Sequence, residues 1–235
     1  MASSGTNGGA LDRSTSQAPG SRRPGTRAGL SAEDVLRAAR AVVEREGAEP
    51  LTMRRLAQEL HVAPNTLYSH FRSKADLMDA VLDTFLAEID VPDEAETDWR
   101  DGLVALLEAS RQTLLGHADL LPLLLSRPMR GPNAVRLGEE TLRLLARGGV
   151  RGPAAVDALR ALLTFTFGSV VLDAPRREEP DPASREARSA AAFSADPERP
   201  MMAELAGPLS RPPTDAAFAT SLRWLIDGIA GAARS

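Results

Sequence analysis

The chain has 235 residues, no cysteine and a formal net charge of −4. A chain of this length forms one large or two small domains. The lack of cysteine excludes disulfides and thiolate zinc sites, and the acidic balance argues against a general nucleic-acid coat. The most apolar stretch, 161–172, is interrupted by Thr164, Thr166 and Ser169, so no membrane span is expected. No secretory segment is visible before residue 30, which favours a cytoplasmic protein without a membrane partner.

Residues 1–29 are rich in Gly, Ser, Thr, Arg and Pro without periodicity, so they are predicted to form a disordered tail. Their arginines leave two interpretations open, a solvated leader or an arm that reaches the minor groove of a bound duplex. The first helix is expected to begin at Ser31, with Asp34 completing a capping box, and to end at Gly47. Its apolar stripe consists of Val35, Ala38, Ala39, Val42 and Val43.

The stretch 52–74 predicts two short helices joined by a tight turn at 61–63. Thr52 stands at an N-cap position, and Pro64 suits the first position of the second helix, where its missing N–H costs nothing. Each helix has an apolar face, made by Met53, Leu56, Ala57 and Leu60 in the first and by Leu67 and Phe71 in the second.

The second of these helices leaves a polar set pointing outward, namely Asn65, Thr66, Tyr68, Ser69 and His70. Short hydrogen-bonding side chains on one exposed helix are typical of a reader of the DNA major groove; the alternative is an ordinary solvated face. Positive charge gathers in the same stretch, where Arg54, Arg55, Arg72 and Lys74 stand against Glu59. This distribution favours a face that lies on phosphate.

The stretch resembles the DNA-binding domain of the TetR family of bacterial repressors. The resemblance rests on Thr52, the LAxxL of 56–60, Val62, the TLYxHF run of 66–71, and Lys74 followed by Leu77. Two positions depart from the family pattern, because His61 replaces the usual glycine of the turn and Ala63 replaces the usual polar cap. Histidine tolerates a positive φ, whereas an alanine cap lowers local stability.

The resemblance also implies roles for single residues. It places Thr52, Tyr68 and Lys74 on backbone phosphates, with His70 supporting these contacts. It places a second set near base edges, namely Arg54, Pro64, Asn65, Thr66 and Ser69. Arg54 can bond guanine O6 and N7, and Asn65 can pair with adenine.

The remaining chain predicts helices only. Ser73 is expected to cap a fourth helix over 74–89, and further helices are expected at 99–114, 120–125, 133–147, 154–174 and 214–233. The charged, Pro-rich segment 175–198 reads as a loop, followed by a short helical turn at 201–205. The final helix has one apolar side, formed by Phe218, Leu222, Leu225, Ile226 and Ile229. The predicted fold is all-α, with a tail over 1–29, a three-helix helix-turn-helix DNA-binding domain over 30–75 and a larger helical ligand-binding and dimerisation domain over 76–235.

The C-terminal half resembles the tetracycline-repressor branch of the same family, through Ser126-Arg127-Pro128 after an apolar helix and Phe165-Thr166-Phe167-Gly168. The resemblance implies a ligand pocket and a four-helix dimer interface. Leu123 stands where that branch has a metal-ligating histidine, so neither a metal nor a cofactor is expected. The candidate ligand-binding residues are His117, Leu121, Leu124, Ser126, Arg127, Val156, Leu159, Leu163 and Phe165. For His117 a surface or cap role is the alternative, and for the apolar residues a core role.

These features predict a homodimeric repressor that binds a palindromic operator in double-stranded DNA and is released by a hydrophobic small molecule. A ligand-independent or activating regulator, and a helical adaptor that binds protein, are the alternatives. An enzyme is disfavoured, because the sequence has no GxSxG, Walker A, GxGxxG or HExxH motif. It also lacks the paired Glu-x-x-His ligands of helical cofactor sites.

Overall fold

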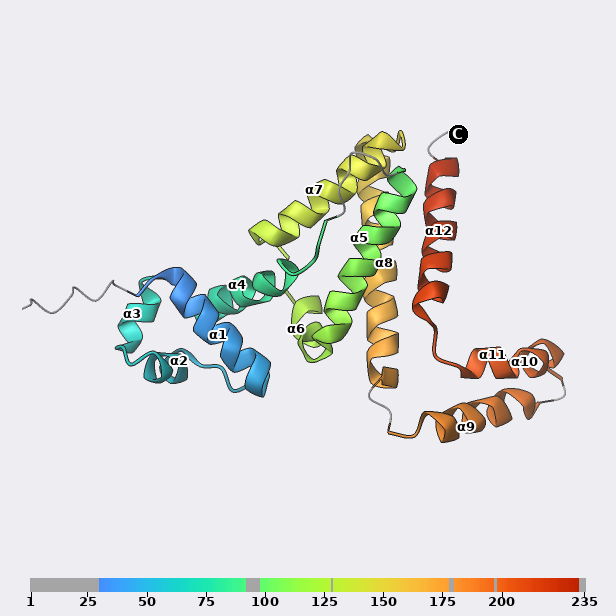
Figure 1. Cartoon of the computed structure of the whole chain (residues 1–235), viewed down its shortest axis with the longest axis horizontal. Coiled ribbons are helices and arrows are strands. Elements are labelled where there is room, and N and C mark those ends of the chain that lie inside the picture. Colours follow the sequence, from blue (N-terminus) through green and yellow to red (C-terminus); the bar gives the residue numbers. More distant parts are fainter. Residues whose placement is uncertain (1–29, 92–97, 128, 178–179, 197, 233–235) are drawn as a thin grey trace, which may run out of the picture. The chain divides into compact units, whose positions relative to one another are not determined.

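A computed structural model describes residues 30–91, 98–127, 129–177, 180–196 and 198–232. Helices make up nearly all regular structure in these ranges, and the described residues contain no strand (Figure 1). The predicted all-α class is therefore confirmed. The expected tail over 1–29 lies outside the described residues.

The N-terminal helices are α1 (Ala32–Glu46), α2 (Met53–Glu59), α3 (Pro64–Tyr68) and α4 (Lys74–Leu86). Their caps follow from the sequence: Ser31 and Asp34 form a capping box, and the Thr52 and Ser73 side chains accept the N–H groups of Arg55 and Asp76. Leu67 is fully buried, and the apolar faces of α1, α2 and α4 are buried as well. Helix α3 packs against α2, which in turn packs against α1.

The C-terminal part is built around α5 (Trp99–Gly116), which packs against α7 (Pro132–Arg147), α8 (Gly152–Arg177) and α12 (Asp215–Ala232). A 3-10 turn over Ala118–Leu120 leads into α6 (Leu121–Leu125). One continuous apolar core joins α5, α7, α8 and α12. Inside it, the buried Arg111 of α5 donates to Asp173 of α8 at 2.7 Å and to Asp215 of α12 at 2.6 Å. Ion pairs therefore tie three helices together.

The loop predicted over 175–198 is wrong, because α9 (Pro182–Ser194) occupies much of it. Proline opens this helix rather than breaking it, since Pro182 is at the first helical position and Asp181 caps it by accepting the N–H of Ser184 at 3.1 Å. The alanines that follow favour helix. Two short helices, α10 (Pro200–Glu204) and α11 (Ala206–Ser210), come next, and α11 packs against α9.

Helix α8 bears on the expectation about membrane spans. Within the described residues, Gly152–Pro175 is long and apolar enough to cross a membrane by length and composition alone. The expectation counted the uninterrupted apolar run, whereas the hydroxyls of Thr164, Thr166 and Ser169 lower the mean hydropathy only slightly. Asp173 in this helix pairs with the buried Arg111, which ties α8 into the helical core.

Candidate nucleic-acid interface and effector cavity

The turn between α2 and α3 has the backbone geometry that the sequence requires. His61 has a φ of 53°, the only positive φ of a non-glycine residue among the described residues. The N–H of Val62 returns to the carbonyl of Ala57 at 2.9 Å and closes the turn. Ala63 makes no side-chain cap, and Pro64 begins α3. The chain therefore makes the tight turn of a helix-turn-helix without glycine.

Helix α3 is anchored on one side and open on the other. Leu67 is fully buried and Phe71 is buried behind it, whereas Tyr68 is 50% exposed. Of the other residues of this segment that were predicted to contact DNA, Thr66 is half-buried and the rest are exposed, namely Pro64, Asn65, Ser69 and His70. The Ser69 hydroxyl donates to the Thr66 carbonyl at 2.6 Å. The helix ends after five residues, so this face is short.

The arginines and the lysine of this part divide into two groups. Arg37, Arg40, Arg45 and Arg55 form ion pairs with carboxylates of the same helices or of a neighbouring one. By contrast, Arg54, Arg72 and Lys74 are exposed and make no side-chain hydrogen bond or ion pair with the described part of the chain. These three cations flank α3 in sequence, so the unpaired positive charge is concentrated beside the open helix face.

Thr52 and Lys74 lie at the beginnings of α2 and α4. The Thr52 oxygen accepts the N–H of Arg55 at 3.1 Å, which leaves the hydroxyl proton available to a phosphate oxygen. Lys74 is the first residue of a 13-residue helix, where the backbone dipole adds to its own charge. The arrangement can therefore hold phosphates on both sides of α3.

The C-terminal core encloses an apolar cavity of about 220 Å³ between α4, α5, α7 and α8. Its walls are mostly aliphatic, with three hydroxyls, and consist of Leu86, Ile89, Leu106, Leu107, Ser110, Leu114, Met129, Ala134, Leu137, Gly138, Thr141, Leu159, Leu163, Thr166 and Phe167. The hydroxyls of Ser110, Thr141 and Thr166 each donate to a carbonyl of their own helix.

Two family models match the chain. One, "Tetracyclin repressor-like, C-terminal domain", matches residues 91–232, and the other, "Bacterial regulatory proteins, tetR family", matches residues 35–81. The chain belongs to the TetR family. The family expected from residues 30–75, called the reading head from here on, is thus confirmed. The chain is a transcriptional regulator of the helix-turn-helix type.

Known TetR-family proteins resemble it over most of its length. Tetracycline repressor protein class A from transposon 1721 of Escherichia coli is 32% identical over 86% of this chain and 91% of its own. An HTH-type transcriptional regulator of Saccharopolyspora erythraea is 31% identical over 67% of each chain. The crystal structure of Streptomyces coelicolor ActR in complex with actinorhodin matches with a TM-score of 0.77, at 28% identity, over 86% of this chain and 96% of that one.

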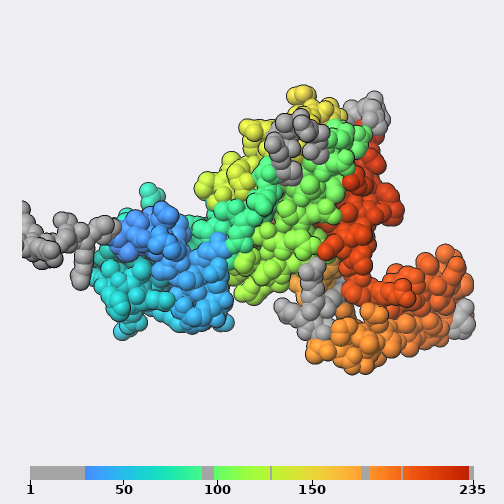
Figure 2. Space-filling model, in the orientation of Figure 1, coloured from blue at the N-terminus to red at the C-terminus, as the bar shows by residue number. Residues whose placement is uncertain are grey.

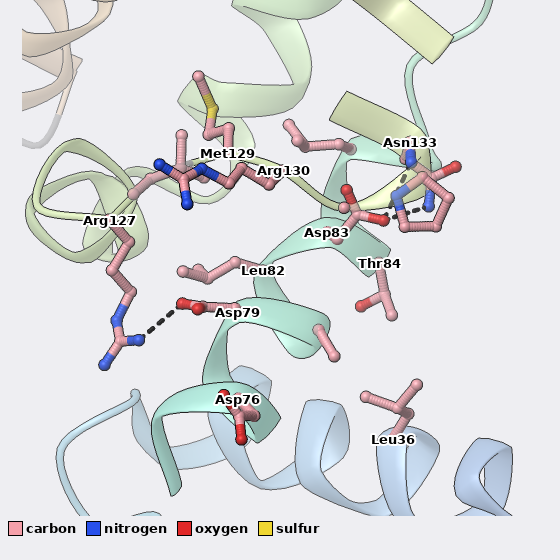
Figure 3. A pocket seen from close by; sticks show the side chains of 15 residues that line it. Leu36, Asp76, Asp79, Leu82, Asp83, Thr84, Arg127, Met129, Arg130 and Asn133 are labelled. Atoms are coloured by element: carbon pink, nitrogen blue, oxygen red, sulfur yellow. Dashed lines mark hydrogen bonds and ion pairs between the residues drawn. The ribbon is translucent and has the colours of Figure 1, made fainter. Parts of the chain in front are cut away.

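The candidate ligand residues of this TetR-family chain lie in several places. Leu159 and Leu163 line the apolar cavity, whereas Leu124 and Arg127 line a second cavity of about 590 Å³ beside α4 (Figure 3). Arg127 there donates to the Asp79 carboxylate at 2.6 Å. Phe165 stacks on Phe218 with ring centroids 5.2 Å apart. Val156 and Ser126 are exposed.

His117 ends α5 and contacts α4 rather than the apolar cavity. Its Nε2 lies 3.0 Å from a Glu88 carboxylate oxygen, and its ring packs on Phe85 at a centroid distance of 4.5 Å. Leu121 and Leu124 pack beside it. Burial lowers the pKa of His117, and the nearby Arg40 lowers it further. A neutral imidazole is therefore favoured at this junction of α1, α4 and α5.

Several residues that line the cavities were not predicted from the sequence. Ser110, Gly138 and Thr141 line the cavity but were not selected, although α5 and α7 each present their cavity residues at a spacing of three and four. That spacing could have indicated the cavity-lining residues, but buried core residues of a helix show the same spacing. No sequence signal marked Asp83, a carboxylate that is only 6% exposed. The part of the chain that the structure describes holds no group of three or more His, Cys, Asp or Glu placed to bind a metal ion.

Proposed function

We propose that this TetR-family regulator is a dimeric repressor, acting in the cytoplasm, that leaves its DNA operator when a hydrophobic small molecule fills the apolar cavity. The observation that carries the proposal is the partition of charge in the reading head. Its other arginines are ion-paired, while Arg54, Arg72 and Lys74 remain free beside the exposed face of α3. Free cations can bind the phosphates of DNA, and the exposed hydrogen-bonding side chains beside them can reach base edges in the major groove.

The DNA contacts follow from position along the head. Thr52, Tyr68 and Lys74 bind backbone phosphates, and His70 supports them. Arg54, Asn65 and Thr66 lie near base edges, together with Pro64 and Ser69. Contacts of the first kind set affinity for all sequences, whereas those of the second kind set the preference for the operator.

The dimer forms through α8 and α12. Both helices expose large apolar side chains, with Leu172 63% exposed and Trp224 71% exposed, and Figure 2 shows α12, in red, at the surface. Burying such a patch against a second copy is favourable. A two-fold dimer can place two reading heads in successive major grooves, about 34–36 Å apart, on a palindromic site.

The effector is a hydrophobic molecule that carries hydrogen-bond donors and needs no metal. The hydroxyls of Ser110, Thr141 and Thr166 donate to their own helices, so they offer lone pairs to a ligand. No carboxylate or imidazole lines the cavity. Because a volume of about 220 Å³ is below the usual range for drug-sized ligands, of about 300–1,000 Å³, larger ligands require the helices to separate. That movement couples the effector cavity to the DNA-binding face, and the coupling free energy in typical cases is about 1–3 kcal/mol.

Two measurements test the proposal. Fluorescence anisotropy with DNA from upstream of the chain's own gene should give specific binding that weakens as salt rises. Thermal-shift screening of apolar phenols and hydroxyquinones, with and without magnesium, should find stabilising compounds that also release this DNA. Specific DNA binding without any stabilising compound would support a ligand-independent regulator, and compounds that strengthen binding would support an activator. Absence of DNA binding would favour a protein-binding adaptor.

A further inference from the structure

Helix α7 is capped by a residue of another helix. Its own N-cap is Gly131, which offers no side chain. Instead, the Asp83 carboxylate of α4 accepts the backbone N–H of Asn133 at 3.0 Å and its side-chain amide at 2.9 Å (Figure 3). It also accepts the backbone N–H of Ala134 at 3.0 Å. A carboxylate at the start of a long helix also interacts favourably with the helix dipole. The first turn of α7 is thus held by α4.

The two segments are in close contact at this point. A Cβ atom on Gly131 would lie 2.2 Å from the Asp83 Cγ, so only glycine permits this approach. A second link is formed by Arg136, whose guanidinium donates to the carbonyls of Leu86 at 3.4 Å and Ile89 at 3.2 Å. The last turns of α4 and the first turn of α7 therefore have little freedom to move separately.

Asp83 lies between the two functional regions of the molecule. Immediately beyond the capped turn, α7 lines the apolar cavity with Ala134, Leu137, Gly138 and Thr141. In the other direction, α4 begins at Lys74, directly after the segment that follows α3. A molecule that enlarges the cavity by moving α7 must move Asp83 with it or leave a buried carboxylate without its hydrogen bonds. The second outcome is costly.

We propose that Asp83 is the positioning residue that transmits occupancy of the cavity from α7 to α4 and hence to the reading head. This inference rests on the proposed function, since it assumes that the cavity controls DNA binding. It adds that control passes through one carboxylate, whose three hydrogen bonds make α4 follow the first turn of α7.

A double-substitution cycle tests the coupling without a known ligand. Gly138→Leu fills the cavity from α7, and the new Cβ meets no heavy atom within 4 Å. In the otherwise unchanged chain it should weaken operator binding at least about fivefold, the lower end of typical coupling. In the Asp83→Asn background the same filling should weaken binding by less than twofold. Glu139→Gln is the matched control, because Glu139 is an exposed carboxylate of α7 that pairs with Arg143 of the same helix at 3.2 Å.

An equal loss of affinity in both backgrounds overturns the role of Asp83 while leaving the proposed function intact. A second measurement covers the case in which cavity filling has no effect at all. Because coupling is reciprocal, operator DNA should change amide hydrogen exchange at Asn133 and Ala134, followed by NMR on the full chain, and the change should disappear in Asp83→Asn. If the exchange of these two amides changes with operator DNA only when Asp83 is present, although Gly138→Leu does not alter operator binding, the link through Asp83 holds and the cavity proposal fails. If operator DNA protects α3 but leaves these two amides unchanged, the link through Asp83 is wrong.

Discussion

At the scale of single residues, side-chain direction decides which charges serve the interface. Arg54 and Arg55 are neighbours on α2, but successive residues on a helix point about 100° apart. Arg55 turns back to Glu46 of α1 and forms an ion pair, whereas Arg54 points to solvent without a partner in the described chain. Sequence alone counts both as basic residues of the head. Their different surroundings make Arg55 the natural control for experiments on Arg54.

The first prediction separates phosphate contacts from base contacts. Tyr68→Ala and Lys74→Ala should weaken binding to all DNA sequences about equally, because both residues are proposed to bind phosphate. Arg54→Ala should cost about 1–3 kcal/mol at one operator position and relax the base preference there. Anisotropy titrations over a set of operator variants measure both effects. Arg55→Ala should leave affinity unchanged within about twofold, since surface ion pairs contribute little to stability. A change of base preference in Lys74→Ala but not in Arg54→Ala would contradict these roles.

The second prediction concerns the buried ion pairs of Arg111. Its guanidinium is 1% exposed and contacts Asp173 and Asp215, while its Nε has no hydrogen-bond partner among the described atoms. Arg111→Met should lower the free energy of unfolding by about 3–5 kcal/mol, because it breaks the buried ion pair between the Arg111 guanidinium and the Asp173 carboxylate. Adding Asp173→Leu should restore most of the loss, which urea denaturation followed by circular dichroism can measure. If the double variant were less stable than Arg111→Met, Asp173 would have an equally important partner elsewhere.

At the scale of helices, short-range signals predicted helix starts well, but the fourth helix ends at Leu86 rather than at the predicted residue 89, and the prediction failed where proline was ambiguous. Ser31, Thr52 and Ser73 cap helices as expected, because each cap is a contact between residues three apart. Segment 175–198 was misread, since Pro182 permits a helix start as readily as it ends a helix. The cavity was only partly predictable. Its periodic faces on α5 and α7 are in the sequence, but the space between them depends on how the helices pack.

The third prediction uses the one uncapped helix start of the head. Ala63 has φ −69° and ψ 143°, the backbone conformation of an N-cap, yet offers no side-chain acceptor. Ala63→Ser should therefore raise the free energy of unfolding by about 1 kcal/mol. The reciprocal change, Ser73→Ala, removes the acceptor for the N–H of Asp76 and should lower it by about the same amount. Thermal denaturation of both variants measures the pair. An unchanged melting temperature in Ala63→Ser would mean that water already satisfies the start of α3.

At the scale of the whole molecule, the last helix has one apolar side buried in the core and a large apolar residue exposed on another side. Phe218, Leu222 and Ile226 face the chain's own core, and Leu222 is fully buried there. Trp224, on another side of α12, is largely exposed, as is Leu172 of α8. The sequence predicted that this apolar side of α12 forms the dimer contact, but Leu222 and Ile226 are buried in the chain's own core. Core and interface are lined by the same residue types, so the sequence alone could not separate them. Only the packing of α12 on α5 and α8 separates them.

The fourth prediction follows from that separation. Trp224→Arg and Leu172→Arg place a charge on exposed surface, so each should leave the chain folded but shift it to the monomer, since a charge in an apolar interface must be desolvated. Operator binding should fall steeply at low protein concentration, because a single head contacts only one half-site. Leu222→Arg is the contrasting variant: it buries an unpaired charge in the core and should unfold the chain. Sedimentation equilibrium with circular dichroism distinguishes these outcomes. If Trp224→Arg stayed dimeric, or if the unaltered protein were a monomer that still bound its operator fully, α8 and α12 would not form the dimer interface.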